Sequence, residues 1–208
     1  RSQRAKITGS YAATVTPRIG DEPSIELSGS LAAGVAEAEA AIARFDERIG
    51  ARLANFAVIA LRTEAASSSQ IENLSAAPSS IAIAEHAAPS ANPRKSNAGL
   101  IAANVATLTA AMAGEGPLDA GEVIEIQRVL LKDSAPHLTG EFRDEQVWVG
   151  GDAYSPHGAS HVAPHHDRVP TAVDDLIGFA NRRDLGALAH IAVTHAQFET
   201  IHPFIHIS

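Results

Sequence analysis

The stretch His195–Phe204 reads HAQFETIHPF and decides how the rest of the chain is interpreted. Its first part continues an amphipathic pattern that predicts a helix over residues 185–200. Pro203 cannot extend this helix, because its ring removes the backbone N–H and clashes with the preceding turn. The sequence therefore predicts a helix that delivers His202 to a turn at its carboxyl end.

Composition favours a small helical protein. The chain has 208 residues, of which 45% are hydrophobic and only 4% are aromatic. Alanine-rich helices can pack closely without large side chains. We therefore expect an all-α fold, mainly a helical bundle, with a short β-hairpin near residues 139–151, where β-branched residues and two glycines follow one another.

Charge and cysteine content narrow the function classes. The net charge of -8 disfavours non-specific nucleic-acid binding, which needs a basic face. The chain has no cysteine, which excludes disulfides and thiolate metal sites and is compatible with a reducing cytoplasm. No apolar run approaches the ~20 residues that span a bilayer, and no signal-peptide pattern is present. We expect a soluble cytoplasmic protein without a membrane partner.

Periodicity places several helices before the hairpin. Residues 31–49 carry apolar side chains at steps of three and four, and Gly50 is expected to end that helix. A second helix is expected from Leu53 to about Ser67, with Ile59 facing inward and Arg62 outward. The first thirty residues are read as an irregular arm and are assigned no function. Further elements are a proline-rich loop or broken helix at 76–95, a helix at 99–113, a helix after Asp119 and a helix opened by Arg168-Val-Pro170.

The run HAQFETIHPF resembles the Fic family of AMP-transferring enzymes, whose catalytic motif is HPFx[DE]GNGR. Four upstream segments fall in the order that members of this family show. These are Gly140-Glu-Phe-Arg143, Val147-Trp-Val-Gly-Gly151, Val169-Pro170 and Asp174-Asp175-Leu176. A match to one segment arises easily by chance, whereas a match to all of them in order does not.

The resemblance implies a protein adenylyltransferase, which moves AMP from ATP to a hydroxyl of a target protein. His202 would be the general base, supported by Pro203 and Phe204 of the same motif. Val147, Trp148, Val149, Gly150 and Gly151 would belong to a flap that docks the target's backbone. The family comparison also divides the chain into an N-terminal helical segment, residues 1–115, and an incomplete catalytic core, residues 116–208.

The end of the motif departs from the family. His206 stands where the family has an acidic magnesium ligand, and magnesium prefers oxygen donors. Ile207 replaces the first glycine of the phosphate-binding turn, and the sequence stops at Ser208. The resemblance implies ATP and magnesium for a complete member, but these residues argue against their binding here. We expect a truncated or frameshifted, inactive relative.

A second family feature lies in the N-terminal half. Ser68, Glu72 and Asn73 match the inhibitory motif [ST]xxxE[GN]. By resemblance, Glu72 would pair with an arginine of the phosphate-binding turn and obstruct the γ-phosphate of ATP. A carboxylate at that position would occupy the cation and repel the incoming anion.

Two other functional classes stay open. His157, His161, His165 and His166 could supply a zinc or nickel site, although a solvated loop is the stronger interpretation. The chain could also be a non-catalytic module that binds a partner protein without chemistry. A second copy of the chain is a further candidate partner.

Overall fold

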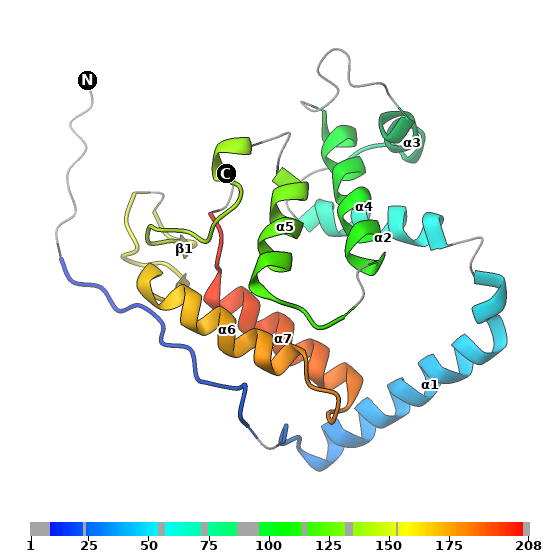
Figure 1. Ribbon diagram of the computed structural model, residues 1–208, viewed down its shortest axis with the longest axis horizontal. Coiled ribbons are helices and arrows are strands. Elements are labelled where there is room, and N and C mark those ends of the chain that lie inside the picture. Colours follow the sequence, from blue (N-terminus) through cyan, green and yellow to red (C-terminus); the bar gives the residue numbers. More distant parts are fainter. Residues whose placement is uncertain are drawn as a thin grey trace. The chain divides into compact units, whose positions relative to one another are not determined.

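The computed structural model describes residues 9–22, 24–53, 57–71, 75–86, 96–113, 116–131, 135–152 and 154–205. Within these ranges it contains seven α-helices and one sheet of two short strands (Figure 1). This confirms the predicted all-α fold with a short hairpin. None of the described helices has both the length and the apolar character needed to cross a membrane.

The chain forms two compact units that are not consecutive in sequence. One comprises Arg1–Glu26, Leu118–Ala120 and Glu141–Ser208, and the other comprises Leu27–Pro117 and Gly121–Gly140. We call them the motif unit and the helical unit, because the first contains His202. The grouping reflects contacts, and the division into residues 1–115 and 116–208 stays a prediction.

The helical unit is built around α4. Its helices are α1 (Gly29–Leu53), α2 (Ala57–Ile71), α3 (Pro78–His86), α4 (Asn97–Ala113) and α5 (Ala120–Leu131), followed by the short 3-10 helix η2 (Pro136–Leu138). Helices α2 and α3 pack on α4 around Ala65, Ile81 and Ile101, all of which are buried. An ion pair between Arg62 and Glu85 links α2 to α3.

Three local predictions for the helical unit were wrong. Helix α1 continues through Gly50 to Leu53, since a single glycine weakens a helix without ending it. Ile59 was expected to face inward but is 55% exposed. Arg62 was expected to face solvent, whereas its hydrogen bonds to Glu85 hold it partly buried and raise its pKa. Periodicity identifies residues that share a helix face, but it cannot identify what covers that face.

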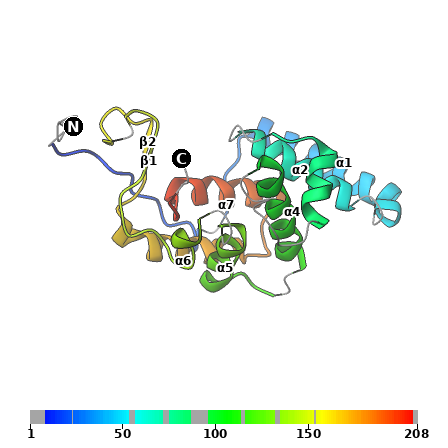
Figure 2. The same cartoon turned by 90° about the horizontal axis from the view of Figure 1, so that it is seen from above.

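The motif unit contains a packed pair of helices and the hairpin. Helices α6 (Val169–Ala180) and α7 (Ala187–Ile201) pack against each other, and the short 3-10 helix η3 (His166–Arg168) leads into α6. Strand β1 (Trp148–Val149) pairs antiparallel with β2 (His161–Val162), and Figure 2 shows the two strands side by side. The buried core of this unit comprises Val169, Val173, Leu176 and Ile201.

The N-terminal arm, described at residues 9–22 and 24–26, belongs to the motif unit and has no helix (Figure 1). Three hydrogen bonds fix it to that unit. The N–H of Thr14 donates to the oxygen of Val162 at 3.0 Å, on β2. The side-chain amide of Gln197 donates to the oxygen of Pro17 at 2.9 Å. The N–H of Ile19 donates to the carboxylate of Asp175 at 2.7 Å. The sequence predicted an irregular arm but gave no sign of these contacts.

Candidate active site

Helix α7 ends at His202 in a conformation that is unusual for a residue with a side chain. His202 has φ 50° and ψ 64°, and its N–H donates to the oxygen of Phe198 at 2.8 Å. It is the one non-glycine residue with positive φ in the described part of the chain. This left-handed conformation costs roughly 1–2 kcal/mol for an L-residue, so neighbouring contacts must hold it.

Arg143 supplies those contacts by binding three consecutive carbonyl groups. Its Nη2 donates to Ile201 O at 3.2 Å, and its Nε donates to His202 O at 2.7 Å. Its backbone N–H donates to Pro203 O at 2.9 Å. The last carbonyl groups of a helix lack partners within the helix and carry partial negative charge. A guanidinium at this position therefore satisfies the end of α7 and fixes the turn that carries His202.

The same guanidinium ties the turn to the hairpin segments. Nη2 of Arg143 also donates to Pro164 O at 2.6 Å, and Nη1 donates to Glu145 O at 2.8 Å. Arg143 is only 4% exposed, and this burial lowers its pKa. Arginine nevertheless keeps its proton in proteins, so the charged group is compensated here by four carbonyl oxygens.

Pro203 and Phe204 anchor the turn by packing. The side chain of Pro203 is fully buried. The ring of Phe204 lies 5.6 Å from that of Phe142 and 6.4 Å from that of Phe198, measured between centroids. The adjacent residues Phe142 and Arg143 thus hold the motif turn in two ways, the first by ring contact and the second by hydrogen bonds.

The hairpin places Trp148 opposite Val162 and Val149 opposite His161. The return strand contains His161, which the sequence suggested only as a metal ligand or part of a solvated loop, so the predicted flap residues are one half of the hairpin. Two residues per strand are too few for periodicity to reveal. The indole N–H of Trp148 donates to Asp152 O at 2.9 Å, within the turn.

Gly150 and Gly151 are required at the turn. Their φ angles are 78° and 73°, in the region that glycine adopts without strain. A Cβ on Gly151 would lie 2.9 Å from the backbone nitrogen of Ala159, and one on Gly150 would lie 2.8 Å from the hydroxyl of Ser160. The two glycines thus permit a close approach of the two halves of the hairpin.

Strand β1 is an edge of this sheet. Its partner β2 lies on one side, and within the described ranges no other strand pairs with it. The arm bonds to β2 through Thr14, so the arm does not take the place of a further strand beside β1. An edge strand of this kind can accept an extended peptide through backbone hydrogen bonds.

Of the predicted inhibitory residues, Ser68 lies within the described ranges. Ser68 lies on α2 and is exposed. Glu72 and Asn73 lie outside the described residues, as does His206. The inhibitory contact and the chemistry at position 206 therefore stay predictions.

The four histidines that were predicted as possible metal ligands do not share one site in the structure. His157 pairs through Nδ1 with the hydroxyl of Ser155 at 2.8 Å, and His161 pairs through Nε2 with Thr200 O at 3.0 Å. His165 and His166 instead lie beside Asp167, which was not among the predicted ligands. A joint site of all four histidines is not formed.

Comparisons with known proteins agree with this architecture. Among solved structures, the chain is similar to a Fic family protein from Desulfovibrio desulfuricans G20, with a TM-score of 0.69 and 21% sequence identity. The likeness covers 89% of this chain and 55% of the other, so the chain spans about half the length of that protein. At this level of identity the likeness shows a shared fold. A search of curated proteins found no match.

A match at the level of the family covers the residues that build the candidate site. Residues 117–206 match the sequence model of the Fic/DOC family. This range includes the segment with Phe142 and Arg143, the hairpin, and the turn at His202. Residues 117–206 of the chain therefore resemble a Fic/DOC family domain.

Proposed function

We propose that this domain has the architecture for transfer of AMP to a hydroxyl group of a protein, with His202 as the general base. The observation that carries the proposal is the turn at His202, whose left-handed backbone is held by bonds from Arg143 to three consecutive carbonyls. Such a fixed base matches what group transfer requires, because positioning contributes more than covalent chemistry.

In this proposal, an imidazole nitrogen of His202 accepts the proton of the target's hydroxyl. The hydroxyl oxygen then bonds to the α-phosphorus of ATP, and pyrophosphate leaves with the electrons of the broken P–O bond. His202 is 9% exposed, so its surroundings limit competition from bulk water. A positioned base of this kind contributes about 10²–10⁴-fold to a rate.

The hairpin supports the proposed role in target docking. A target segment in extended form could bond to the free edge of β1, beside Trp148 and Val149. Phe142 and Arg143 precede β1 by a few residues and contact the turn at His202. One short segment of chain thus connects the proposed docking edge to the proposed base.

The residues present do not fit magnesium. Position 206 offers an imidazole where an oxygen donor is needed, and Ile207 disfavours the backbone conformation of an anion-binding turn. We therefore propose that this sequence transfers little or no AMP, although it carries His202 and the hairpin. Loss of one oxyanion-type donor alone costs about 10²–10³-fold.

The test compares two proteins in a lysate with labelled ATP and magnesium. The first is the chain itself, and the second replaces His206, Ile207 and Ser208 by Asp, Gly and Asn and continues with the family's Gly-Arg and following helices. We expect labelling only from the second protein, with loss of labelling in its His202→Ala variant. Labelling that survives His202→Ala in the completed protein would refute the role of His202.

A second candidate function is capture of a target protein without chemistry. The free edge of β1 favours it, because this edge does not depend on the residues that depart from the family motif. Binding of a target that is unchanged by His202→Ala, but lost when Trp148→Pro removes the outward-facing backbone donor of the edge strand, would support this function.

A further inference from the structure

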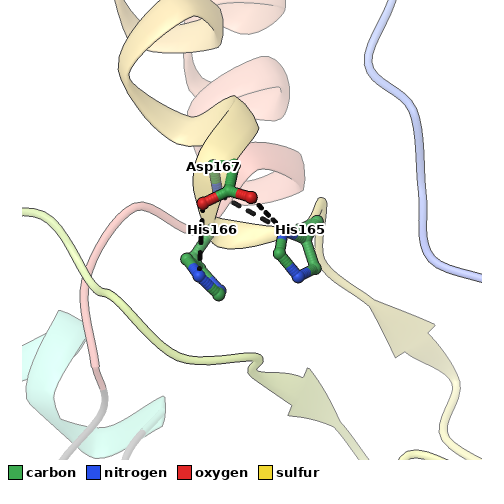
Figure 3. Close-up of side chains that lie close together, drawn as sticks. All are labelled: His165, His166 and Asp167. Carbon is green, nitrogen blue, oxygen red and sulfur yellow. Dashed lines mark hydrogen bonds and ion pairs between the residues drawn. The ribbon is translucent and has the colours of Figure 1, made fainter.

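Three consecutive residues before α6 bring their donor atoms together (Figure 3). Nδ1 of His165 lies 3.3 Å from one carboxylate oxygen of Asp167, and Nε2 of His166 lies 3.3 Å from the other. One ligand atom from each residue lies within 4.8 Å of the other two. The carboxylate thus faces both imidazole rings.

These spacings are those of neighbouring ligands around a small metal ion. Zinc binds imidazole nitrogen at about 2.0–2.1 Å and carboxylate oxygen at about 2.0–2.2 Å. Two ligands of a tetrahedral zinc ion are therefore about 3.4 Å apart. Each nitrogen here lies at nearly this distance from one of the two oxygens of the Asp167 carboxylate. The two nitrogens can approach further, because the side chains of His165 and Asp167 are 51% and 78% exposed.

The backbone geometry shows that Nδ1 of His165 has a lone pair to offer. The N–H of Asp167 donates to this nitrogen at 3.4 Å, so it acts as an acceptor at the start of η3. The hydrogen bond is long, and a metal ion at Nδ1 would replace it.

The segment that carries these residues is fixed at both ends. Pro164, just before it, is fully buried and its oxygen accepts from Arg143 at 2.6 Å. Val169, just after it, is buried in the core of the motif unit. At His166, Nδ1 is buried without a hydrogen-bond partner among the described residues. No such bond sets the tautomer, so Nε2 can turn its lone pair toward an ion.

We propose that His165, His166 and Asp167 form a binding site for a first-row transition-metal ion, with zinc as the expected occupant. Two imidazoles and a carboxylate suit zinc, and three protein ligands leave a coordination position for water. This site is separate from the magnesium chemistry of the family motif and needs oxygen from only one residue. Its occupancy would fix the connection between β2 and α6.

The test is calorimetric titration of zinc chloride into the whole chain, prepared without a histidine tag and treated with a chelator. At about pH 7.5 we expect one zinc ion per chain. His165→Ala and Asp167→Asn should each raise the Kd for zinc by at least about tenfold. Even the loss of a residue that only hydrogen-bonds to a metal ligand lowers metal affinity about 10–100-fold. Both side chains are exposed, so circular dichroism should show unchanged helix content.

His137→Ala is the matched control, because His137 is an exposed histidine on another short 3-10 helix. It should leave the Kd unchanged. Cobalt should give a visible absorption band in the wild type that Asp167→Asn weakens. Absence of zinc binding would overturn the proposal, and so would wild-type Kd values for both His165→Ala and Asp167→Asn. These readouts do not depend on AMP transfer.

Discussion

Nε of Arg143 lies 2.7 Å from the backbone oxygen of His202, although 59 positions separate the two residues in the sequence. The bond joins the segment before the hairpin to the end of α7. Together with the bonds to Ile201 and Pro203, it makes the backbone at His202 depend on one arginine. The Gly140–Arg143 segment therefore supports the site through its backbone contacts with the motif.

Replacement of this arginine should destabilise the domain. Arg143→Ala leaves buried carbonyl groups of Ile201, His202 and Pro164 without their donor, which we expect to lower the free energy of unfolding by about 2–4 kcal/mol. Arg143→Lys should lose nearly as much, because one ammonium cannot reproduce a planar fork of donors. Urea unfolding measures both variants.

The matched control is Arg168→Ala, since Arg168 is exposed. Its free energy of unfolding should stay within about 0.5 kcal/mol of the wild type. If Arg143→Ala behaves like this control, the arginine does not hold the turn.

A carboxylate on α6 should hold the N-terminal arm. Asp175 accepts from the N–H groups of Ile19 at 2.7 Å and Gly20 at 3.3 Å, and from Nε of Arg18 at 3.4 Å. Loss of hydrogen bonds to a charged group costs about 1.5–3 kcal/mol. Asp175→Ala should therefore accelerate tryptic cleavage after Arg18 by at least about tenfold.

The neighbouring Asp174 provides the control for the arm. Asp174 is exposed on the same helix, so Asp174→Ala removes the same charge without touching the arm. Cleavage after Arg18 should keep the wild-type rate in this variant. Equal acceleration in both variants would point to a general charge effect and against a specific contact.

The hairpin turn offers a third test. Gly151→Ala places a Cβ 2.9 Å from the nitrogen of Ala159 and at a φ of 73°. We expect a loss of about 1–2 kcal/mol from the left-handed backbone alone. The emission of Trp148, the single tryptophan of the chain, should shift toward that of an exposed indole. Gly178→Ala is the control, because nothing lies within 4 Å of its added Cβ and the helix should gain about 0.5–1 kcal/mol.

The sequence predicted the fold best where a proline marks one end of a segment with helical periodicity. Pro170 marks the start of α6 and Pro203 the end of α7, and both helices form close to their predicted ranges. The continuation of α1 past Gly50 was missed, because a glycine within a helix has a small cost that neighbouring residues can outweigh.

Only part of the candidate site could be predicted from the sequence. A motif identified His202, but the carbonyl contacts of Arg143 depend on a backbone path that no sequence pattern records. The same holds for the arm, whose bonds to Asp175 use main-chain N–H groups that every residue type offers. Asp167 was not predicted as a ligand, because a single exposed aspartate beside two histidines carries no pattern that separates a ligand from a solvated side chain.

The last prediction concerns Glu72 and needs the completed motif. In a protein whose tail after Ile205 carries the family's acidic residue, glycine-rich turn, arginine and following helices, we expect magnesium-dependent AMP transfer that starts low. The resemblance at Ser68, Glu72 and Asn73 implies that Glu72 would pair with the restored arginine and obstruct the γ-phosphate.

Glu72→Gly should therefore raise the transfer rate and the ATP affinity of the completed protein, as measured by labelled-AMP incorporation and by nucleotide titration. In the chain with Ile205-His206-Ile207, the same substitution should change neither quantity, because His206 and Ile207 replace the acidic residue and the first glycine of the motif. The test is the difference between the effect of Glu72→Gly in the completed protein and its effect in the original chain. If Glu72→Gly leaves the completed protein's rate and affinity unchanged, Glu72 is not inhibitory, even where His202→Ala abolishes transfer.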